Sequence, residues 1–170
     1  MNRYPYVLIV FFLITLACAK TEKKPPFHPP ENAAQLLTND STKTWKFARR
    51  YNGQTRMNME GCFLKYLQTF RKDGTVADNN SQNANCGPSL KGDWQIQQKG
   101  NGFFYLQVYD EGVSDLLNQE SDTINFKLLY LDKDSLAISF YHNQFGTKRL
   151  ITDYLVEESI EVKNRNFHWK

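Results

Sequence analysis

The three cysteines are the residues of this 170-residue chain with the most distinctive chemistry. Cys18 ends an apolar run that begins at Tyr6, whereas Cys62 and Cys86 lie in the polar middle of the chain. A basic Arg3, a short apolar core and then small residues are the pattern of a secretory signal. A transmembrane helix needs about 20 apolar residues, and this run is shorter. The sequence therefore predicts export.

Cys18 stands where an exported chain can be modified. Ile14-Thr15-Leu16-Ala17-Cys18 resembles the lipobox of bacterial lipoproteins, in which the signal is removed before the cysteine. The resemblance implies a signal peptide at residues 1–17, three acyl chains on Cys18 and lasting attachment, since one chain binds membranes only marginally. Ala19 implies the outer membrane, with the periplasmic or cell-surface side undecided. An ordinary signal peptide with an incidental cysteine is the alternative.

Cys62 and Cys86 are the remaining thiols. In an exported chain an even pair is most simply a disulfide. Closing a loop of about 25 residues would stabilise the fold by roughly 3–4 kcal/mol, and would restrain the polar stretch Asp78 to Asn85. A reactive thiol or metal pair is the competing interpretation, but no histidine or acidic cluster with ligand spacing accompanies them. We expect a structural disulfide.

Signatures of enzymes do not appear in the sequence. His28, His142 and His168 are too dispersed for a metal site or a catalytic triad. Neither a Gly-rich phosphate loop nor a nucleophile elbow is present. Most aspartates fall in turns, where they form local hydrogen bonds, although paired catalytic carboxylates stay open. We expect a protein that is not an enzyme and uses neither a metal nor another cofactor.

The charge of the mature chain is nearly balanced. Arg3 is the only charged residue of the signal, so 20 basic and 18 acidic side chains remain. A net charge of +2 gives no reason to expect nucleic acid as a partner. The densest basic group is typical of a solvated face, although it could meet anionic lipid or polysaccharide; it comprises Lys46, Arg49, Arg50, Arg56, Lys65, Arg71 and Lys72.

Flanking segments set the limits of the folded domain at residues 31–163. Residues 18–30 contain four prolines among charged residues and predict an extended tether. A short helix is expected at Glu31–Leu37, after these prolines. Residues 164–170 form a C-terminal tail, in which Phe167-His168-Trp169 either docks or is disordered.

The alternation of apolar and polar residues within the domain has a period of two and is broken by short turns, among them Asn52-Gly53 and Lys72–Thr75. It predicts about eight strands, with a strand from Cys62 to Phe70, one helical turn within Asp110–Ser121, and Ile160–Val162 extending the last strand or adding another. Short connections without crossover helices predict an all-β, antiparallel up-and-down barrel.

A barrel of eight strands is just wide enough to be filled by side chains or to hold one small ligand. The inward-facing candidates are large and aromatic, and we expect them to fill the interior rather than to line a cavity. Arg49 shares the Trp45 face by alternation, where it would cap an aromatic ring or, less simply, meet an anionic ligand. The candidate pocket residues are Trp45, Phe47, Arg49, Tyr66, Trp94, Tyr105, Phe126 and Tyr130.

Four short motifs resemble the lipocalin-like domains of bacterial lipoproteins. They are Thr44-Trp45-Lys46, Phe70-Arg71-Lys72-Asp73-Gly74-Thr75, Gly92-Asp93-Trp94-Gln95-Ile96 and Leu131-Asp132-Lys133-Asp134-Ser135-Leu136. The resemblance covers roughly residues 31–157 and implies a lipocalin-like barrel. The position two residues before the first Trp, glycine in true lipocalins, is Lys43.

Two functions are therefore expected of a lipid-anchored barrel in the cell envelope. The first is a non-enzymatic binding module for another envelope protein, for example as an accessory subunit of an outer-membrane complex. The second is a carrier that holds a small hydrophobic or amphipathic molecule inside the barrel. A cavity of a few hundred cubic ångströms beside Arg49 would favour the carrier. A filled interior with an exposed apolar patch would favour the partner module.

Overall fold

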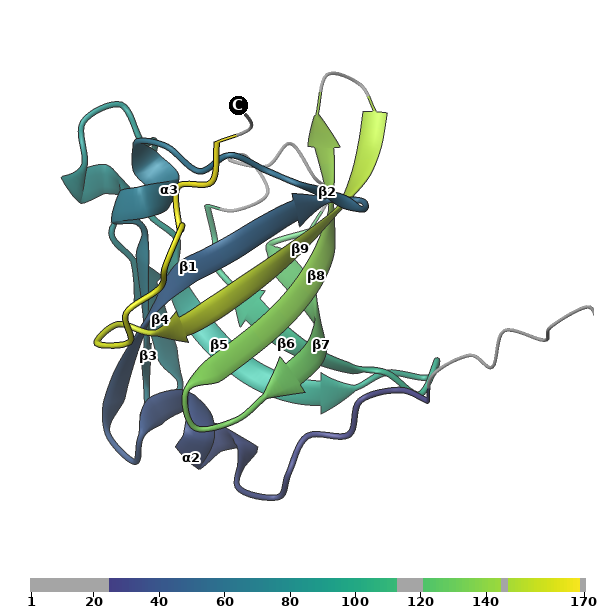
Figure 1. The fold of residues 1–170 in the computed structure, drawn as a ribbon. Helices are drawn as coiled ribbons and strands as arrows, with labels where there is room; N and C mark the ends of the chain where they lie inside the picture. Colours follow the sequence, from purple (N-terminus) through teal and green to yellow (C-terminus); the bar gives the residue numbers. More distant parts are fainter. Residues whose placement is uncertain (1–24, 113–120, 145–146, 169–170) are drawn as a thin grey trace, which may run out of the picture.

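The computed structural model describes residues 25–112, 121–144 and 147–168, which form one curled antiparallel sheet and two short α-helices. Eight of the nine strands close into a barrel because β1 pairs with both β3 and β9 (Figure 1). The short β2 pairs with the end of β1. The elements are α2 (Ala33–Thr38), β1 (Thr42–Asn52), β2 (Thr55–Arg56), α3 (Cys62–Lys65), β3 (Leu67–Arg71), β4 (Thr75–Asp78), the 3-10 turn η2 (Asn80–Gln82), β5 (Lys91–Gln98), β6 (Phe104–Tyr109), β7 (Thr123–Leu131), β8 (Ser135–Gln144) and β9 (Thr147–Glu157).

This architecture confirms the predicted all-β, up-and-down, lipocalin-like barrel of about eight strands with a short N-terminal helix. The signal peptide (1–17), Cys18, the first part of the tether, the expected helical turn within 113–120 and Trp169 lie outside the described residues. No helix in the described ranges is long and apolar enough to cross a bilayer.

Aspartate side chains form two of the predicted turns. The Asp73 carboxylate accepts hydrogen bonds from the Thr75 N–H (2.9 Å) and hydroxyl (2.7 Å). Gly74 beside it has a φ of +90°, which L side chains rarely adopt. Asp132 likewise accepts from the N–H groups of Asp134 (2.8 Å) and Ser135 (2.7 Å). These carboxylates therefore serve local turn chemistry, as expected.

Helix α2 closes one end of the barrel (Figure 1). Trp45 is fully buried there, and its indole N–H donates to the Leu37 carbonyl (3.0 Å). The Lys43 ammonium lies 4.3 Å from the centroid of the Trp45 ring and donates to the Leu36 and Lys133 carbonyls. These contacts give the buried polar atoms hydrogen-bond partners. Side chains fill this end of the barrel, as we expected for the whole interior.

Two β-bulges shift the alternation on which the inward-facing residues were predicted. In β1 the register shifts between Phe47 and Arg49, so Ala48 is the extra residue and Arg49 turns outward. In β7 a second shift between Leu128 and Tyr130 turns Tyr130 outward. Because side chains alternate with a period of two, one extra residue reverses every face beyond it.

Some predicted boundaries are wrong. The expected strand from Cys62 to Phe70 begins with the single helical turn α3, and the strand starts at Leu67. Ile160–Val162 form no strand. The chain instead turns back after β9, where Arg165 donates hydrogen bonds to the Phe47 and Phe63 carbonyls.

Candidate ligand pocket

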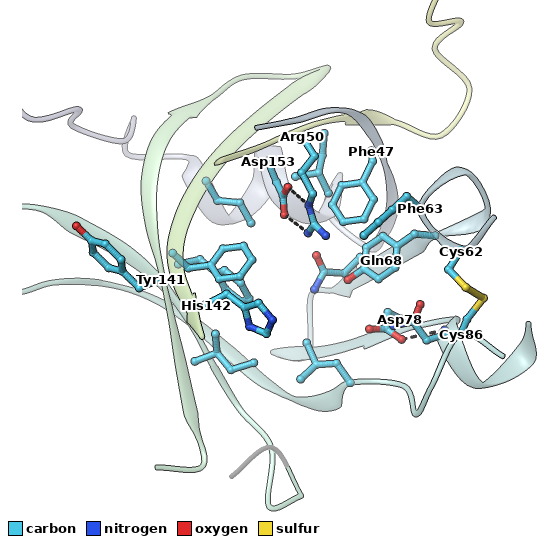
Figure 2. Close-up of a pocket in the computed structure, with 18 of the residues that line it drawn as sticks. Phe47, Arg50, Cys62, Phe63, Gln68, Asp78, Cys86, Tyr141, His142 and Asp153 are labelled. Carbon is cyan, nitrogen blue, oxygen red and sulfur yellow. Dashed lines mark hydrogen bonds and ion pairs between the residues drawn. A yellow bond between two sulfur atoms is a disulfide. The ribbon is translucent and has the colours of Figure 1, made fainter. Parts of the chain in front are cut away.

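A cavity of about 690 Å³ occupies the half of the barrel bordered by α3 and the paired ends of β8 and β9, and none of the described residues that line it belongs to α2. Figure 2 shows the Cys62–Cys86 disulfide on one side of it and the β8 residues Tyr141 and His142 on the opposite side. Its volume lies within the range of about 300–1,000 Å³ typical of small-molecule sites. The prediction that aromatic side chains fill the interior therefore holds at the α2 end and is wrong for this half.

The walls of the cavity are mainly apolar. The Phe47 and Tyr66 rings stack with centroids 4.4 Å apart, and Phe126 meets Phe140 edge to face at 5.2 Å. Such aromatic pairs contribute more free energy than the burial of their apolar area alone. They therefore stabilise the arrangement of the wall. The remaining apolar lining comes from Phe63, Pro88, Leu90, Ile124, Ile138 and Leu155.

Arg50 and Asp153 form an ion pair in the wall. They are direct neighbours across β1 and β9, and Arg50 Nε and Nη2 each donate to one carboxylate oxygen at 2.6 Å. The guanidinium also lies 4.6 Å from the centroids of both the Phe47 and Phe63 rings. Burial raises the pKa of Asp153 above its ordinary value, and Arg50 opposes that rise. Protein groups thus already neutralise this positive charge.

Tyr66 and Asp78 form a second polar group in the wall. The Asp78 carboxylate accepts a hydrogen bond from the Asn80 N–H at 3.0 Å. Desolvation raises the pKa of Asp78, although this hydrogen bond and the neighbouring Tyr66 and Ser89 hydroxyls act to lower it. Desolvation also raises the pKa of Tyr66 well above its usual value, so the phenol stays neutral.

The disulfide fixes one side of the cavity. Cys62 and Cys86 are joined with an S–S distance of 2.02 Å, which confirms the predicted bond. It ties α3 to the segment that follows η2, and both cysteines line the cavity. The predicted structural brace is therefore also part of the pocket wall.

The predicted pocket residues are only partly brought together. Phe47, Tyr66 and Phe126 line the cavity. Trp45 packs at the closed end, and Trp94 packs against the core and donates from its indole N–H to the Arg71 carbonyl (3.1 Å).

Arg49, Tyr105 and Tyr130 were predicted to point inward and do not. Arg49 and Tyr130 are exposed because of the two bulges. Tyr105 lies on the outer face, because β6 points Leu106 and Val108 into the core instead. The predicted cation–π contact exists, but Arg50 makes it in place of Arg49.

Sequence reasoning missed the polar residues of the cavity. Gln68 lies two residues after Tyr66 and two before Phe70, so the alternation of this strand places it inward. Asp153 lies between Ile151 and Leu155 on the buried face of β9. A polar residue in the middle of an apolar face was the signal in both cases.

A shallower groove of about 430 Å³ lies on the outer surface. Arg49, Tyr130 and Tyr154 line it together with residues 160–163 of the segment after β9. The exposed fractions of Tyr130 and Tyr154 are 46% and 43%. Two of the side chains predicted to face the interior thus form an external surface.

No three His, Cys, Asp or Glu side chains gather into a metal site within the part of the chain that the structure describes. Comparison of the chain with models of known protein families and with curated protein sequences gives no match.

Proposed function

We propose that this protein is a lipid-anchored carrier of the cell envelope that holds one small apolar or amphipathic molecule inside its barrel. The observation that carries the proposal is the cavity of about 690 Å³, walled by aromatic and aliphatic side chains and adjoining a few polar groups. A large apolar pocket with a few polar groups is the usual form of a small-molecule site. The volume of the cavity supports a carrier, although the arginine in its wall is Arg50 and not the expected Arg49.

The anchor rests on the lipobox-like residues that end at Cys18. Cells grown with an alkyne-tagged fatty acid should label the chain, and Cys18→Ser should lose the label and leave the membrane fraction. A labelled Cys18→Ser protein would contradict this part of the proposal.

Binding can be tested with diphenylhexatriene, a hydrocarbon that fluoresces when it enters an apolar site. The purified full-length protein, freed of lipid and detergent, should bind it saturably with a stoichiometry of one. Ile124→Trp should weaken binding at least tenfold, because Ile124 lines the cavity and indole removes part of its space. Lys127→Trp on the same strand is the control, since Lys127 is not a cavity residue and its ammonium contacts the Phe103 ring. Equal affinities of the two variants would refute a site in the barrel.

The outer groove favours a second candidate function, that of an accessory subunit docked to another envelope protein. Exposed aromatic side chains are enriched at protein interfaces. A photo-crosslinking residue at Tyr154 in intact cells should then give one discrete protein adduct, while the same residue at Tyr109, also exposed but on β6, should give none. Identical adduct patterns at both positions would refute a specific partner at the groove.

A further inference from the structure

Gln68 is a buried amide that lines the cavity and has no protein partner among the described residues. Only 4% of the residue is exposed, yet its side chain makes no hydrogen bond within residues 25–112, 121–144 and 147–168. Figure 2 shows the amide between Asp153 and Asp78, turned toward the middle of the pocket. Among the described residues no fully enclosed side-chain nitrogen or oxygen lacks a hydrogen-bond partner, so the amide atoms of Gln68 reach the open space of the cavity, where a ligand can pair with them.

The charged groups beside Gln68 are already satisfied by protein. Asp153 holds Arg50 with two hydrogen bonds of 2.6 Å. Asp78 accepts from the Asn80 N–H, with the Tyr66 and Ser89 hydroxyls beside it. A carboxylate ligand would therefore have to share Arg50 with Asp153, and an ammonium ligand would have to share Asp78 with the donors that surround it. Gln68 offers both a donor and an acceptor that no described protein group uses.

We infer that the carried molecule is an uncharged amphiphile, with an apolar body against the aromatic wall and a hydroxyl, amide or carbonyl group hydrogen-bonded to Gln68. This inference rests on the proposed carrier function and narrows its ligand class. Gln68 is then the residue that sets specificity for the polar group, while the Arg50–Asp153 and Tyr66–Asp78 pairs shape the site around it. The apolar part of the ligand lies toward Phe126 and Phe140.

The test compares Gln68→Leu with the wild type, because leucine keeps the size of the side chain and removes its hydrogen bonds. Gln97→Leu is the matched control, since Gln97 is exposed on β5 outside the cavity. Decanol, decanoate and decylamine are titrated against bound diphenylhexatriene on the purified full-length protein at pH 7. One net hydrogen bond corresponds to a three- to tenfold change in affinity.

Gln68→Leu should weaken decanol binding three- to tenfold and leave diphenylhexatriene binding unchanged or tighter. Gln97→Leu should alter none of these. Unchanged decanol affinity in Gln68→Leu, or stronger competition by decanoate or decylamine than by decanol in the wild type, would overturn the inference while diphenylhexatriene binding stands. Failure of diphenylhexatriene to bind the wild type would instead overturn the carrier function itself.

Discussion

Removal of one member of the Arg50–Asp153 pair should destabilise the protein far more than removal of both. Asp153→Leu leaves the guanidinium unpaired in the wall, with 16% of the Arg50 side chain exposed. Breaking a buried pair in this way typically costs about 3–5 kcal/mol. Because Arg50 adjoins an open cavity, we expect the lower end of that range, about 3 kcal/mol. The two aromatic rings that flank the guanidinium limit its access to water.

Arg50→Met should cost a similar amount at pH 7, because only 3% of the Asp153 side chain is exposed and the carboxylate would have no cation. Burial already raises the folded-state pKa of Asp153. Its unfolded value is about 3.9. The penalty in Arg50→Met should therefore be absent below the unfolded pKa and should grow as the pH rises through the folded pKa.

The double variant Arg50→Met/Asp153→Leu replaces the pair with apolar groups, which is often neutral or stabilising. We expect its free energy of unfolding to lie within about 1 kcal/mol of the wild type, so the coupling energy of the cycle is several kcal/mol. Urea unfolding followed by tryptophan fluorescence measures all four proteins, since Trp45 is fully buried. Single variants that each cost under about 1 kcal/mol and add within about 0.5 kcal/mol would refute the reasoning.

Three further predictions concern stability. Cys62→Ser/Cys86→Ser should lower the free energy of unfolding by about 3–4 kcal/mol, since the bond joins positions 24 residues apart; an unchanged urea midpoint would contradict the brace. Burial raises the folded-state pKa of Asp78. Asp78→Asn should therefore be more stable than the wild type at pH 7 and equally stable below about pH 4, the unfolded pKa. A difference in the free energy of unfolding that does not change with pH, measured by urea titration, would contradict this expectation. Trp45→Phe should cost about 2–3 kcal/mol in thermal unfolding, because it leaves a gap and removes the donor to the buried Leu37 carbonyl; a loss below about 1 kcal/mol would show that this end repacks.

Local chemistry made much of the fold predictable. The aspartates at positions 73 and 132, together with Gly74, mark turns by hydrogen bonds that span two or three residues. Period-two alternation between such turns then indicates antiparallel strands. The disulfide was predictable because an even pair of cysteines, in a chain whose N-terminal residues resemble an export signal, has few other uses.

The bulges were not predictable from alternation. Ala48 and Leu129 resemble any other strand residue, yet each adds one position to its strand and reverses the facing of the residues after it. This is why Arg49 and Tyr130 were expected in the pocket and Arg50 was not. Detecting such an insertion requires the register against the neighbouring strand, which a single sequence does not contain.

The candidate site depends on the same long-range register. Arg50 and Asp153 are 103 residues apart and become neighbours only when β1 pairs with β9. The cavity likewise reflects how the aromatic side chains divide between the two ends of the barrel. Trp45 and Phe70 fill the α2 end, whereas Phe126 and Phe140 stand at the wall. Volume left between side chains follows from packing, and residue types alone do not determine it.

A crystal structure of the full-length protein with diphenylhexatriene would test the central claim most directly. We expect one probe molecule inside the barrel, in contact with Phe126 and Phe140. A barrel whose own side chains fill that space, or a probe bound solely on the outer surface, would contradict it.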